Sequence, residues 1–292
     1  DRIVASIRSL EPIDGESQRL VLEYPLEIIG RELTQLLNVL FGNISLQRDI
    51  RLEGFELPPS LLGAFKGPRY GRKGLAQLVG GAGRPLLCTA LKPVGLSSDE
   101  LAELSYRFAL GGIDIIKEDH GLTDPPFSPF AERVQACTRA VRKGNKESGH
   151  SAMFVPNVSA PAHAFYRRAH LAATLGAGGL LAAPGLMGFD TVRVLAEDDN
   201  LGLPILSHPS LLGGYTVHPG EGIDHGALYG QLNRLVGADG VIFPNHGGRF
   251  PFTGDECRDL VDGTARPMGR IRATMPMPAG GMSLERVEEM VE

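Results

Sequence analysis

The sequence predicts an α/β fold, a TIM (β/α)8 barrel preceded by a smaller α+β (ferredoxin-like) domain. From Gly81 onward, short apolar segments alternate with amphipathic segments of helical periodicity. Each apolar segment ends in a polar or glycine-rich loop. Strands and helices that alternate with right-handed crossovers build a parallel sheet. Seven such units in this sequence favour a closed barrel over a doubly wound sheet.

The units follow one another along the chain. The expected strands are residues 85–91, 112–116, 152–156, 179–183, 204–207, 240–243 and, more weakly, 273–278. The expected helices are residues 98–110, 129–142, 162–175, 189–197, 223–236, 255–261 and 284–291, with Ser98 and Ser283 as candidate N-caps. The chain stops after the seventh helix and begins at Asp1 without a methionine. We therefore expect a sequence truncated at both ends, with the eighth unit beyond Glu292.

The first part of the chain lacks this alternation. Residues 21–24 are typical of a strand, and residues 26–40 carry helical periodicity. Prolines at 58, 59 and 68 interrupt the chain before the barrel begins. We therefore assign residues 1–75 to the remnant of the N-terminal domain with its linker, and residues 76–292 to the barrel.

Composition excludes several classes of protein. The 292 residues have a net charge of −5 and no basic block, so nucleic acid is not an expected partner. No apolar run is long enough to span a membrane, and no membrane partner is expected. Three unpaired-looking cysteines argue against a disulfide framework and favour a cytoplasmic location. With 42% hydrophobic residues, the chain can build a large core.

A dense polar cluster ends the second expected strand. Lys117, Glu118, Asp119 and His120 follow one another directly after an apolar run. Packing does not require such a cluster, whereas α/β proteins build their sites at the carboxyl ends of strands. Lys117 and Asp119 are two residues apart, so on a strand their side chains point to the same side.

The other expected loops carry further polar groups, and in a barrel these loops converge on one face. Each residue taken alone is more often a capped or solvated loop residue, but the loops taken together favour an enzyme. In chain order the candidates are Thr89 and Lys92; Asn157 and Ser159; Pro184 and Gly185; His208, Pro209 and Ser210; Asn245, His246, Gly247, Gly248 and Arg249; and Ala279, Gly280 and Gly281.

The residue types indicate a metal site. Mg²⁺ prefers oxygen ligands and keeps open positions for substrate oxygens. Asp119 offers one ligand and Glu118 another if the backbone turns there, while His120 suits a transition metal better. The alternative for Lys117 is an ion pair with Asp119, which would keep the lysine charged and a poor base. The Gly-Gly pairs suit backbone N–H groups directed at a phosphate or carboxylate, although an ordinary tight turn is the alternative.

Several segments resemble, in order and spacing, the large subunit of ribulose-bisphosphate carboxylase (RuBisCO). Residues 85–97 resemble its first barrel strand, and residues 111–120 resemble its Gly-Gly-Leu-Asp…Lys-Asp-Asp-Glu motif. Residues 41–44, 58–59 and 65–68 match its link between the N-terminal domain and the barrel, and residues 277–281 its seventh-strand loop. The resemblance covers nearly the whole chain. It implies a homodimer whose active site lies at the subunit interface, with Asn43 supplied by the neighbouring subunit.

In this family the lysine of the motif is carbamylated by CO₂, and the carbamate binds Mg²⁺ together with two carboxylates. Lys117 and Asp119 keep that pattern, whereas His120 stands where the last carboxylate belongs. The resemblance therefore implies a Mg²⁺ site formed by Lys117 as carbamate, Asp119 and His120.

Other departures fall on groups that a carboxylase needs. Lys92, three residues after Thr89, stands where the family has two lysines, and on a regular strand it would point outward unless a bulge corrects it. Pro209 replaces a phosphate-binding arginine. The sixth-strand histidine is absent, and the loop 245–249 lacks the lysine that contacts the CO₂-derived carboxylate. We therefore interpret the chain as a RuBisCO-like (form IV) protein that does not fix carbon.

The resulting hypothesis is metal-assisted enolisation, isomerisation or decarboxylation of a sugar-derived keto substrate, either a sugar phosphate or an oxo sugar acid. Two alternatives remain, a true carboxylase with unusual site residues and a non-catalytic scaffold or regulatory member of the family. The catalytic candidates are Lys92, Lys117 and His208, with Lys92 or His208 as the acid/base. The substrate-binding candidates are Asn43, Thr89, Asn157, His246, Arg249, Gly280 and Gly281.

Overall fold

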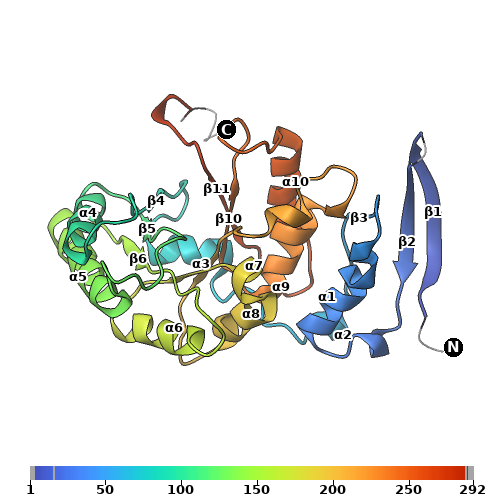
Figure 1. The fold of residues 1–292 in the computed structure, drawn as a ribbon, viewed down its shortest axis with the longest axis horizontal. Coiled ribbons are helices and arrows are strands. Elements are labelled where there is room, and N and C mark those ends of the chain that lie inside the picture. Colours follow the sequence, from blue (N-terminus) through green and yellow to red (C-terminus); the bar gives the residue numbers. More distant parts are fainter. Residues whose placement is uncertain (1–3, 16, 287, 289–292) are drawn as a thin grey trace.

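The centre of the protein is a set of parallel strands that follow chain order (Figure 1). The computed structural model describes residues 4–15, 17–286 and 288. One sheet has the order β4-β5-β6 and a second the order β11-β10-β8-β7, and a parallel bridge between Asn157 and Leu181 joins them. All the expected strands are present, most of them shorter than expected. They are β4 Cys88–Ala90, β5 Ile115–Lys117, β6 Met153–Val155, β7 Leu180–Ala182, β8 Ile205–Ser207, β10 Gly240–Pro244 and β11 Met275–Ala279.

Helices connect these strands and cover their outer face (Figure 1). Helix α5 continues past the expected end at residue 142 and stops at Gly149, whose φ of 78° suits the left-handed conformation that ends helices. The cap of α4 is Ser97 rather than Ser98, because Ser97 and Glu100 form a reciprocal capping box. The helices are α3 Gly71–Leu78, α4 Ser98–Leu110, α5 Phe130–Ser148, α6 Phe165–Thr174, α7 Pro184–Met187, α8 Phe189–Glu197, α9 Asn233–Val236 and α10 Gly254–Ala265.

Two expected helices differ from the structure. Residues 223–236 form the end of β9 (Gly222–Ile223), a π-helical segment Gly226–Leu232, and only then α9. The π-helical segment lies against α10 so closely that a Cβ on Gly230 would be 2.4 Å from the Gly263 carbonyl carbon. Of the expected helix at 284–291, the 3-10 turn Leu284–Arg286 is described, and most of the remainder lies outside the described residues.

Apolar side chains form two layers, one on each face of the strands. The outer cluster packs strands against helices and includes Ile116 and Phe154. The inner cluster contains Ile115, Met153, Val155, Leu181, Leu206 and Ile242, with Leu75 and Val79 of the α3 region packed among them. Because side chains alternate along a strand, Lys117 lies on the same face of β5 as Ile115 and so on the inner face.

Carboxylates at the amino ends of two strands have structural roles. Asp239, just before β10, is buried and accepts hydrogen bonds from the backbone N–H groups of Tyr70, Gly71 and Ile205. Asp114, just before β5, accepts two hydrogen bonds from Arg84 and one from the Leu87 backbone. Each carboxylate therefore ties a preceding segment to the base of the sheet.

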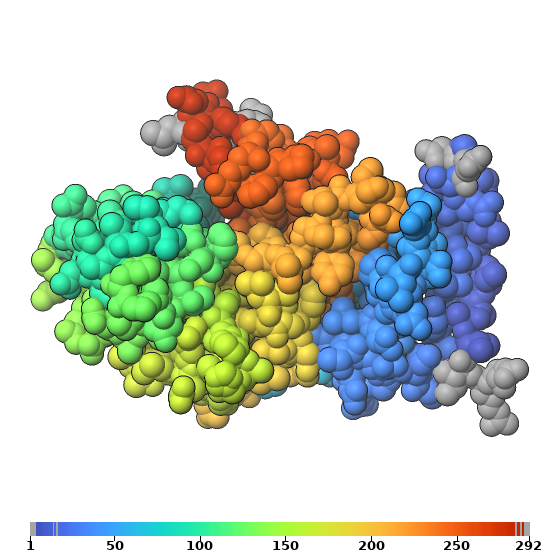
Figure 2. Space-filling model, in the orientation of Figure 1, coloured from blue at the N-terminus to red at the C-terminus, as the bar shows by residue number. Residues whose placement is uncertain are grey.

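The N-terminal segment lies beside this core. Strands β1 (Ser6–Asp14) and β2 (Ser17–Glu23) form an antiparallel hairpin at the edge of the molecule (Figure 2). Helix α1 (Leu33–Phe41) buries Leu33 and Leu36, and β3 (Arg51–Leu52) pairs in parallel with β9. The remaining elements here are the 3-10 turns Leu26–Ile28 and Asn43–Leu46 and helix α2 Pro59–Leu62, and a further 3-10 turn, Gly213–Tyr215, precedes β9. An N-terminal domain that ends at residue 75 stays a prediction.

Two further expectations concern membranes and disulfides. In the described part of the chain, no helix is long and apolar enough to cross a membrane. The cysteines Cys88, Cys137 and Cys257 are all free.

A pair of hydrogen-bonded carboxyl groups joins the π-helical segment to α10. Asp224 forms an ion pair with Arg51 of β3, at 3.3 Å between Nε and Oδ2. Burial, together with the hydrogen bond and charge of Asp224, raises the pKa of Asp259 from 3.8 to about 7. The carboxyl of Asp259 also accepts the backbone N–H of Gly226. Asp259 therefore carries a proton in the folded protein at pH values where an unfolded aspartate is ionised.

This proton predicts a pH-dependent stability. A carboxyl with a raised folded pKa stabilises the fold fully below the unfolded pKa, and the contribution is lost as the pH rises through about 7. Asp259→Asn keeps a neutral hydrogen-bonding side chain, so it should remove this dependence. We expect the difference in Tm between wild type and variant to fall steadily between about pH 4 and pH 7 and to level off above it. Parallel Tm curves over that range would contradict the assignment.

Candidate active site

The loop after β5 brings Lys117, Asp119 and His120 to the carboxyl end of the strands. Asp119 is nearly buried and forms an ion pair with Lys92 through its Oδ2 atom. Its Oδ1 atom accepts the Gly121 backbone N–H at 2.8 Å and lies 3.6 Å from His120 Nδ1. Burial alone would raise the pKa of Asp119, but the Lys92 and Gly121 donors outweigh it and the pKa falls below its ordinary value. Asp119 is therefore an ionised carboxylate at the centre of the cluster.

Lys92 reaches this cluster despite its odd offset from Thr89. The expectation was that Lys92 points outward on a regular strand unless a bulge corrects it, and it took Thr89 to face the site. Ala90 instead pairs with the inward Lys117, so continued alternation brings Lys92, two residues later, to the inner side without a bulge. The side chain is 55% exposed, and its ammonium group contacts Asp119 from the solvent side.

Lys117 is a buried amine with few partners. The residue is 9% exposed, and its amine donates a long hydrogen bond, 3.3 Å from Nζ to the Glu118 carbonyl. The alternative of a direct Lys117–Asp119 ion pair is not realised, because Lys92 takes that position. Burial, helped by the positive charge of Lys92, lowers the pKa of Lys117. The neutral amine is therefore more accessible to Lys117 than to an exposed lysine.

Two histidines stack at the same rim. The rings of His120 and His208 are 4.3 Å apart between centroids, with 15° between their planes. Burial and the nearby charge of His120 lower the pKa of His208 to about 3, and burial also lowers the pKa of His120. The Ser210 backbone N–H donates to His208 Nδ1 at 3.2 Å, which leaves Nε2 to carry the proton of a neutral ring. His208 is thus better suited to donate a hydrogen bond than to act as a base.

Glu118 points away from this cluster. It is fully buried on the outer side of the strands, where both carboxylate oxygens contact the guanidinium of Arg133. The option that Glu118 binds the metal is therefore wrong. Arg133 was not among the predicted residues. Its position on the apolar face of α5, next to Phe130 and Val134, could have indicated a buried charged partner.

Asn157 lies at the site, but its side chain forms hydrogen bonds to backbone groups of the protein. Its amide donates to the His120 carbonyl at 2.9 Å and accepts the Ser159 N–H at 3.1 Å. Asn157 is 1% exposed. Its geometry indicates a part in shaping the rim, and a substrate contact stays a prediction.

Thr89 is placed differently from the expectation. It pairs with Ile116, whose side chain belongs to the outer cluster, while Ala90 pairs with the inward Lys117. Side chains of paired residues share a face, so the Thr89 side chain faces outward. The strand register does not support a substrate contact through this hydroxyl.

The loops after β10 and β11 lie together. Asn245 N–H donates to the Ala279 carbonyl at 2.8 Å, and Arg249 N–H to the Gly280 carbonyl at 3.4 Å. Gly280 and Gly281 have φ values of 84° and 96°, which glycine adopts without strain. The exposed guanidinium of Arg249 is one of the cations that lower the pKa of His120, so this loop faces the same rim.

Two further predicted substrate contacts are His246 and Asn43. His246 follows β10, and its carbonyl accepts a hydrogen bond from Arg286 at 2.9 Å. Asn43 is exposed in the turn that follows α1. Helix α1 lies on the side of the molecule opposite α4 and α5 (Figure 1). Asn43 therefore lies away from the cluster of its own chain, as the predicted contribution to a neighbouring subunit requires.

The donor set decides whether a metal ion fits. Among the described residues, no three His, Cys, Asp or Glu side chains cluster closely enough to hold a metal ion. Asp119 is an ionised carboxylate, and the low pKa of His120 leaves an unprotonated ring nitrogen for coordination. A carbamate on Lys117 would add the missing oxygen ligands. Forming it would cost the buried amine only one long hydrogen bond, to the Glu118 carbonyl. The residues therefore fit Mg²⁺ when Lys117 is carbamylated.

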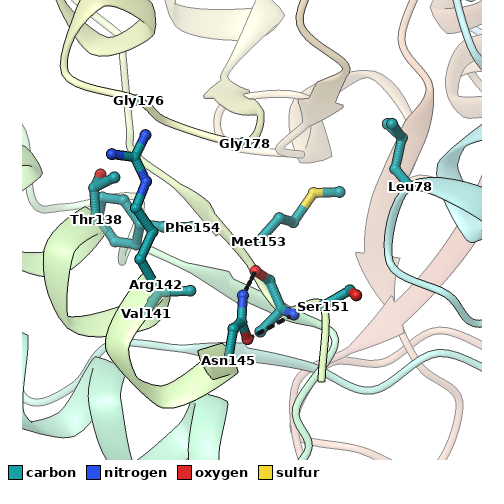
Figure 3. A pocket seen from close by; sticks show the side chains of 11 residues that line it. Leu78, Thr138, Val141, Arg142, Asn145, Ser151, Met153, Phe154, Gly176 and Gly178 are labelled. Atoms are coloured by element: carbon teal, nitrogen blue, oxygen red, sulfur yellow. Dashed lines mark hydrogen bonds between the residues drawn. The ribbon is translucent and has the colours of Figure 1, made fainter. Parts of the chain in front are cut away.

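A separate recess lies at the other end of the strands (Figure 3). Side chains of Thr138 and Arg142 from α5 line it, together with Met153 at the start of β6 and Gly178 just before β7. These positions mark the amino ends of the strands. None of the residues expected in the active site lines this recess.

Comparison with known proteins agrees with this architecture. Residues 73–251 match the family described as ribulose bisphosphate carboxylase large chain, catalytic domain. The chain is 39% identical over 292 residues to 5-methylthioribulose-1-phosphate isomerase from Rhodospirillum rubrum, and spans 76% of that protein. It is 38% identical over 291 residues to ribulose bisphosphate carboxylase-like protein 1 from Rhodopseudomonas palustris, and spans 77% of it.

Solved structures give the same result. A RuBisCO-like protein from Rhodopseudomonas palustris superimposes with a TM-score of 0.92 at 38% identity, covering 98% of this chain and 80% of that one. The carboxylase from Pyrococcus horikoshii gives 0.94 at 29% identity, covering 99% and 69%. The fold alone therefore does not distinguish a RuBisCO-like protein from a carboxylase. The chain belongs to the ribulose bisphosphate carboxylase large-chain family, and its relatives include the RuBisCO-like members of that family.

Proposed function

We propose that this chain carries the active site of a RuBisCO-like isomerase or enolase that acts on a phosphorylated, sugar-derived ketone and does not fix CO₂. The observation that carries the proposal is the rim cluster: a buried lysine of lowered pKa beside an ionised carboxylate and two neutral histidines. The Rhodospirillum rubrum relative is named for isomerising a methylthio sugar phosphate. A substrate of that class supplies both a carbonyl next to an acidic C–H bond and a phosphate.

The departures from a carboxylase support this choice over carbon fixation. Pro209 occupies the place of a phosphate-binding arginine, and the loop 245–249 contains no lysine. A carboxylase needs a cation to bind the carboxylate formed from CO₂, whereas an isomerase needs only proton movement. Incorporation of labelled CO₂ into ribulose bisphosphate would establish the carboxylase alternative.

The chain's own residues divide the work. Lys117 (as carbamate), Asp119 and His120 would hold Mg²⁺, which when bound polarises a carbonyl and favours loss of the neighbouring proton. His208 Nε2 donates a hydrogen bond to a substrate oxygen, because its ring stays neutral. Lys92 Nζ lies at the solvent side of Asp119, and the ion pair keeps it charged, so it can give a proton to the substrate. Arg249 and the Gly280-Gly281 turn bind the phosphate.

The proposed enzyme is a cytoplasmic homodimer whose site is completed by Asn43 of the neighbouring subunit. This part of the proposal follows from the family resemblance and from the outlying position of Asn43. Closure of the seven parallel strands β4, β5, β6, β7, β8, β10 and β11 into a barrel belongs to the same proposal.

Lys117→Ala tests the metal site directly. We expect wild type to gain thermal stability from Mg²⁺ only when bicarbonate is present, because the carbamate supplies ligands. The variant should lose that gain, and kcat/KM for 5-methylthioribulose 1-phosphate should fall by about 10³-fold. Lys66→Ala removes an exposed lysine that pairs with Asp199 on the barrel exterior, and it should behave as wild type.

The outcomes separate the competing functions. Full turnover in Lys117→Ala would exclude the proposed site. Stabilisation of wild type by Mg²⁺ without bicarbonate would indicate a metal site that does not use the carbamate. No stabilisation under any condition, and no turnover, would favour the scaffold alternative.

Lys92→Gln tests the proton-transfer role. The variant removes the ammonium group that now pairs with Asp119, so Asp119 becomes more available to a cation. We expect tighter Mg²⁺ binding in the presence of bicarbonate, yet a kcat lower by about 10²-fold or more. Exchange of the substrate α-proton with D₂O, followed by NMR, should slow in parallel with turnover. Unchanged exchange would assign the proton transfer to another group.

A further inference from the structure

We propose that Arg133 and Glu118 are positioning residues that hold the segment after β5 in the one shape that turns Lys117 and Asp119 toward the rim. The inference rests on the proposed function, because it names what keeps that site assembled. Neither side chain is part of the rim cluster: Glu118 and Arg133 contact each other on the outer side of the strands.

The two side chains form a closed, bidentate ion pair. Arg133 Nε lies 2.7 Å from Glu118 Oε1, and Arg133 Nη2 lies 3.3 Å from Glu118 Oε2. Both side chains are 0% exposed. A bidentate contact between a planar guanidinium and a carboxylate allows essentially one relative orientation. The pair therefore fixes the direction of the Glu118 side chain more tightly than an apolar contact would.

The remaining hydrogen bonds of the pair tie one helix and two loops together. Arg133 also donates to the Thr123 carbonyl at 2.6 Å and to the Ser128 carbonyl. Glu118 Oε2 accepts the backbone N–H of Asn157 at 2.8 Å, and the Asn157 side chain in turn donates to the His120 carbonyl at 2.9 Å. The pair thus connects α5, the loop after β5 and the loop after β6.

Because side chains alternate along the chain, the fixed Glu118 side chain also sets the direction of Lys117 and Asp119. Glu118 stands between Lys117 and Asp119, and neighbouring residues of an extended chain point to opposite faces. Anchoring Glu118 on the outer face therefore directs both neighbours inward. A rotation of this segment would move the amine and the carboxylate together.

Stability alone is a weak explanation for the pair. Replacing a buried ion pair by uncharged residues of similar size is often neutral or stabilising, whereas removing one partner leaves a costly buried charge. A pair that served only to hold α5 could be replaced without effect on the site. A positioning pair could not be, and this difference can be measured.

The test compares a double variant with a matched control. Glu118→Gln/Arg133→Met removes both charges while keeping side-chain volume. Arg234→Met removes another buried arginine, on α9, that donates to the carbonyls of Gly263, Arg266, Ile271 and Arg272. Both proteins are first compared by circular dichroism and Tm. Mg²⁺ affinity in bicarbonate, kcat and KM are then measured below either unfolding transition.

We expect the double variant to fold, to bind Mg²⁺ at least tenfold more weakly and to lose at least tenfold in kcat, with KM nearly unchanged. KM should persist because the phosphate-binding loops after β10 and β11 are untouched. Arg234→Met should lower Tm without changing Mg²⁺ affinity or kcat. Wild-type Mg²⁺ affinity and kcat in the double variant would overturn the proposal.

Hydrogen exchange provides a readout that does not depend on the metal. Backbone amides of residues 119–123 should exchange faster in the double variant and at the wild-type rate in Arg234→Met. If wild-type protein itself neither binds Mg²⁺ nor turns over, the proposed function fails, and this exchange comparison still decides the positioning claim. If the double variant does not fold, Arg133→Lys replaces it, because lysine keeps the positive charge but cannot bind both carboxylate oxygens as the planar guanidinium does. Unchanged exchange in a folded variant contradicts the proposal.

Discussion

Alternation of side chains at the carboxyl end of β5 is the constraint on which the site depends. The side chains of three consecutive residues there take alternate faces. Lys117 and Asp119 face the rim, and Glu118 lies on the outer face against Arg133. The inner face below them is filled by the apolar cluster around Ile115 and Val155, so the polar groups occupy the top layer of an otherwise dry interior. The chemistry at the rim is therefore a consequence of strand register as much as of residue type.

Burial then sets the protonation states. An ammonium group loses hydration inside a protein, so the pKa of Lys117 falls, and the same effect keeps the stacked histidines neutral. Asp119 remains ionised because donors surround it. A neutral amine can react with CO₂, and a neutral imidazole can coordinate or donate a hydrogen bond. Burial next to the ionised, hydrogen-bonded Asp119 thus favours the neutral forms of Lys117 and the two histidines, which the proposed reaction uses.

The sequence was sufficient for the order of strands and helices and for the family. Helices at 98–110 and 189–197 have the expected bounds, because each carries a regular apolar periodicity that becomes its buried face. The π-helical segment was missed because its cause is the close approach of Gly230 to Gly263, which are distant in sequence. The direction of Lys92 could not be read from the sequence for a similar reason, since it depends on how β4 pairs with β5. The Glu118–Arg133 pair could be recognised only from an arginine on an apolar helix face, a signal that does not name its partner.

The proposed metal site depends on a carbamate on Lys117. Carbon-13 NMR of the protein in ¹³C-bicarbonate and Mg²⁺ detects this group. We expect a carbamate carbonyl resonance in wild type that is absent in Lys117→Ala and unaffected in Lys66→Ala. An active wild-type enzyme without that resonance, or a resonance that persists in Lys117→Ala, would exclude carbamylation of Lys117.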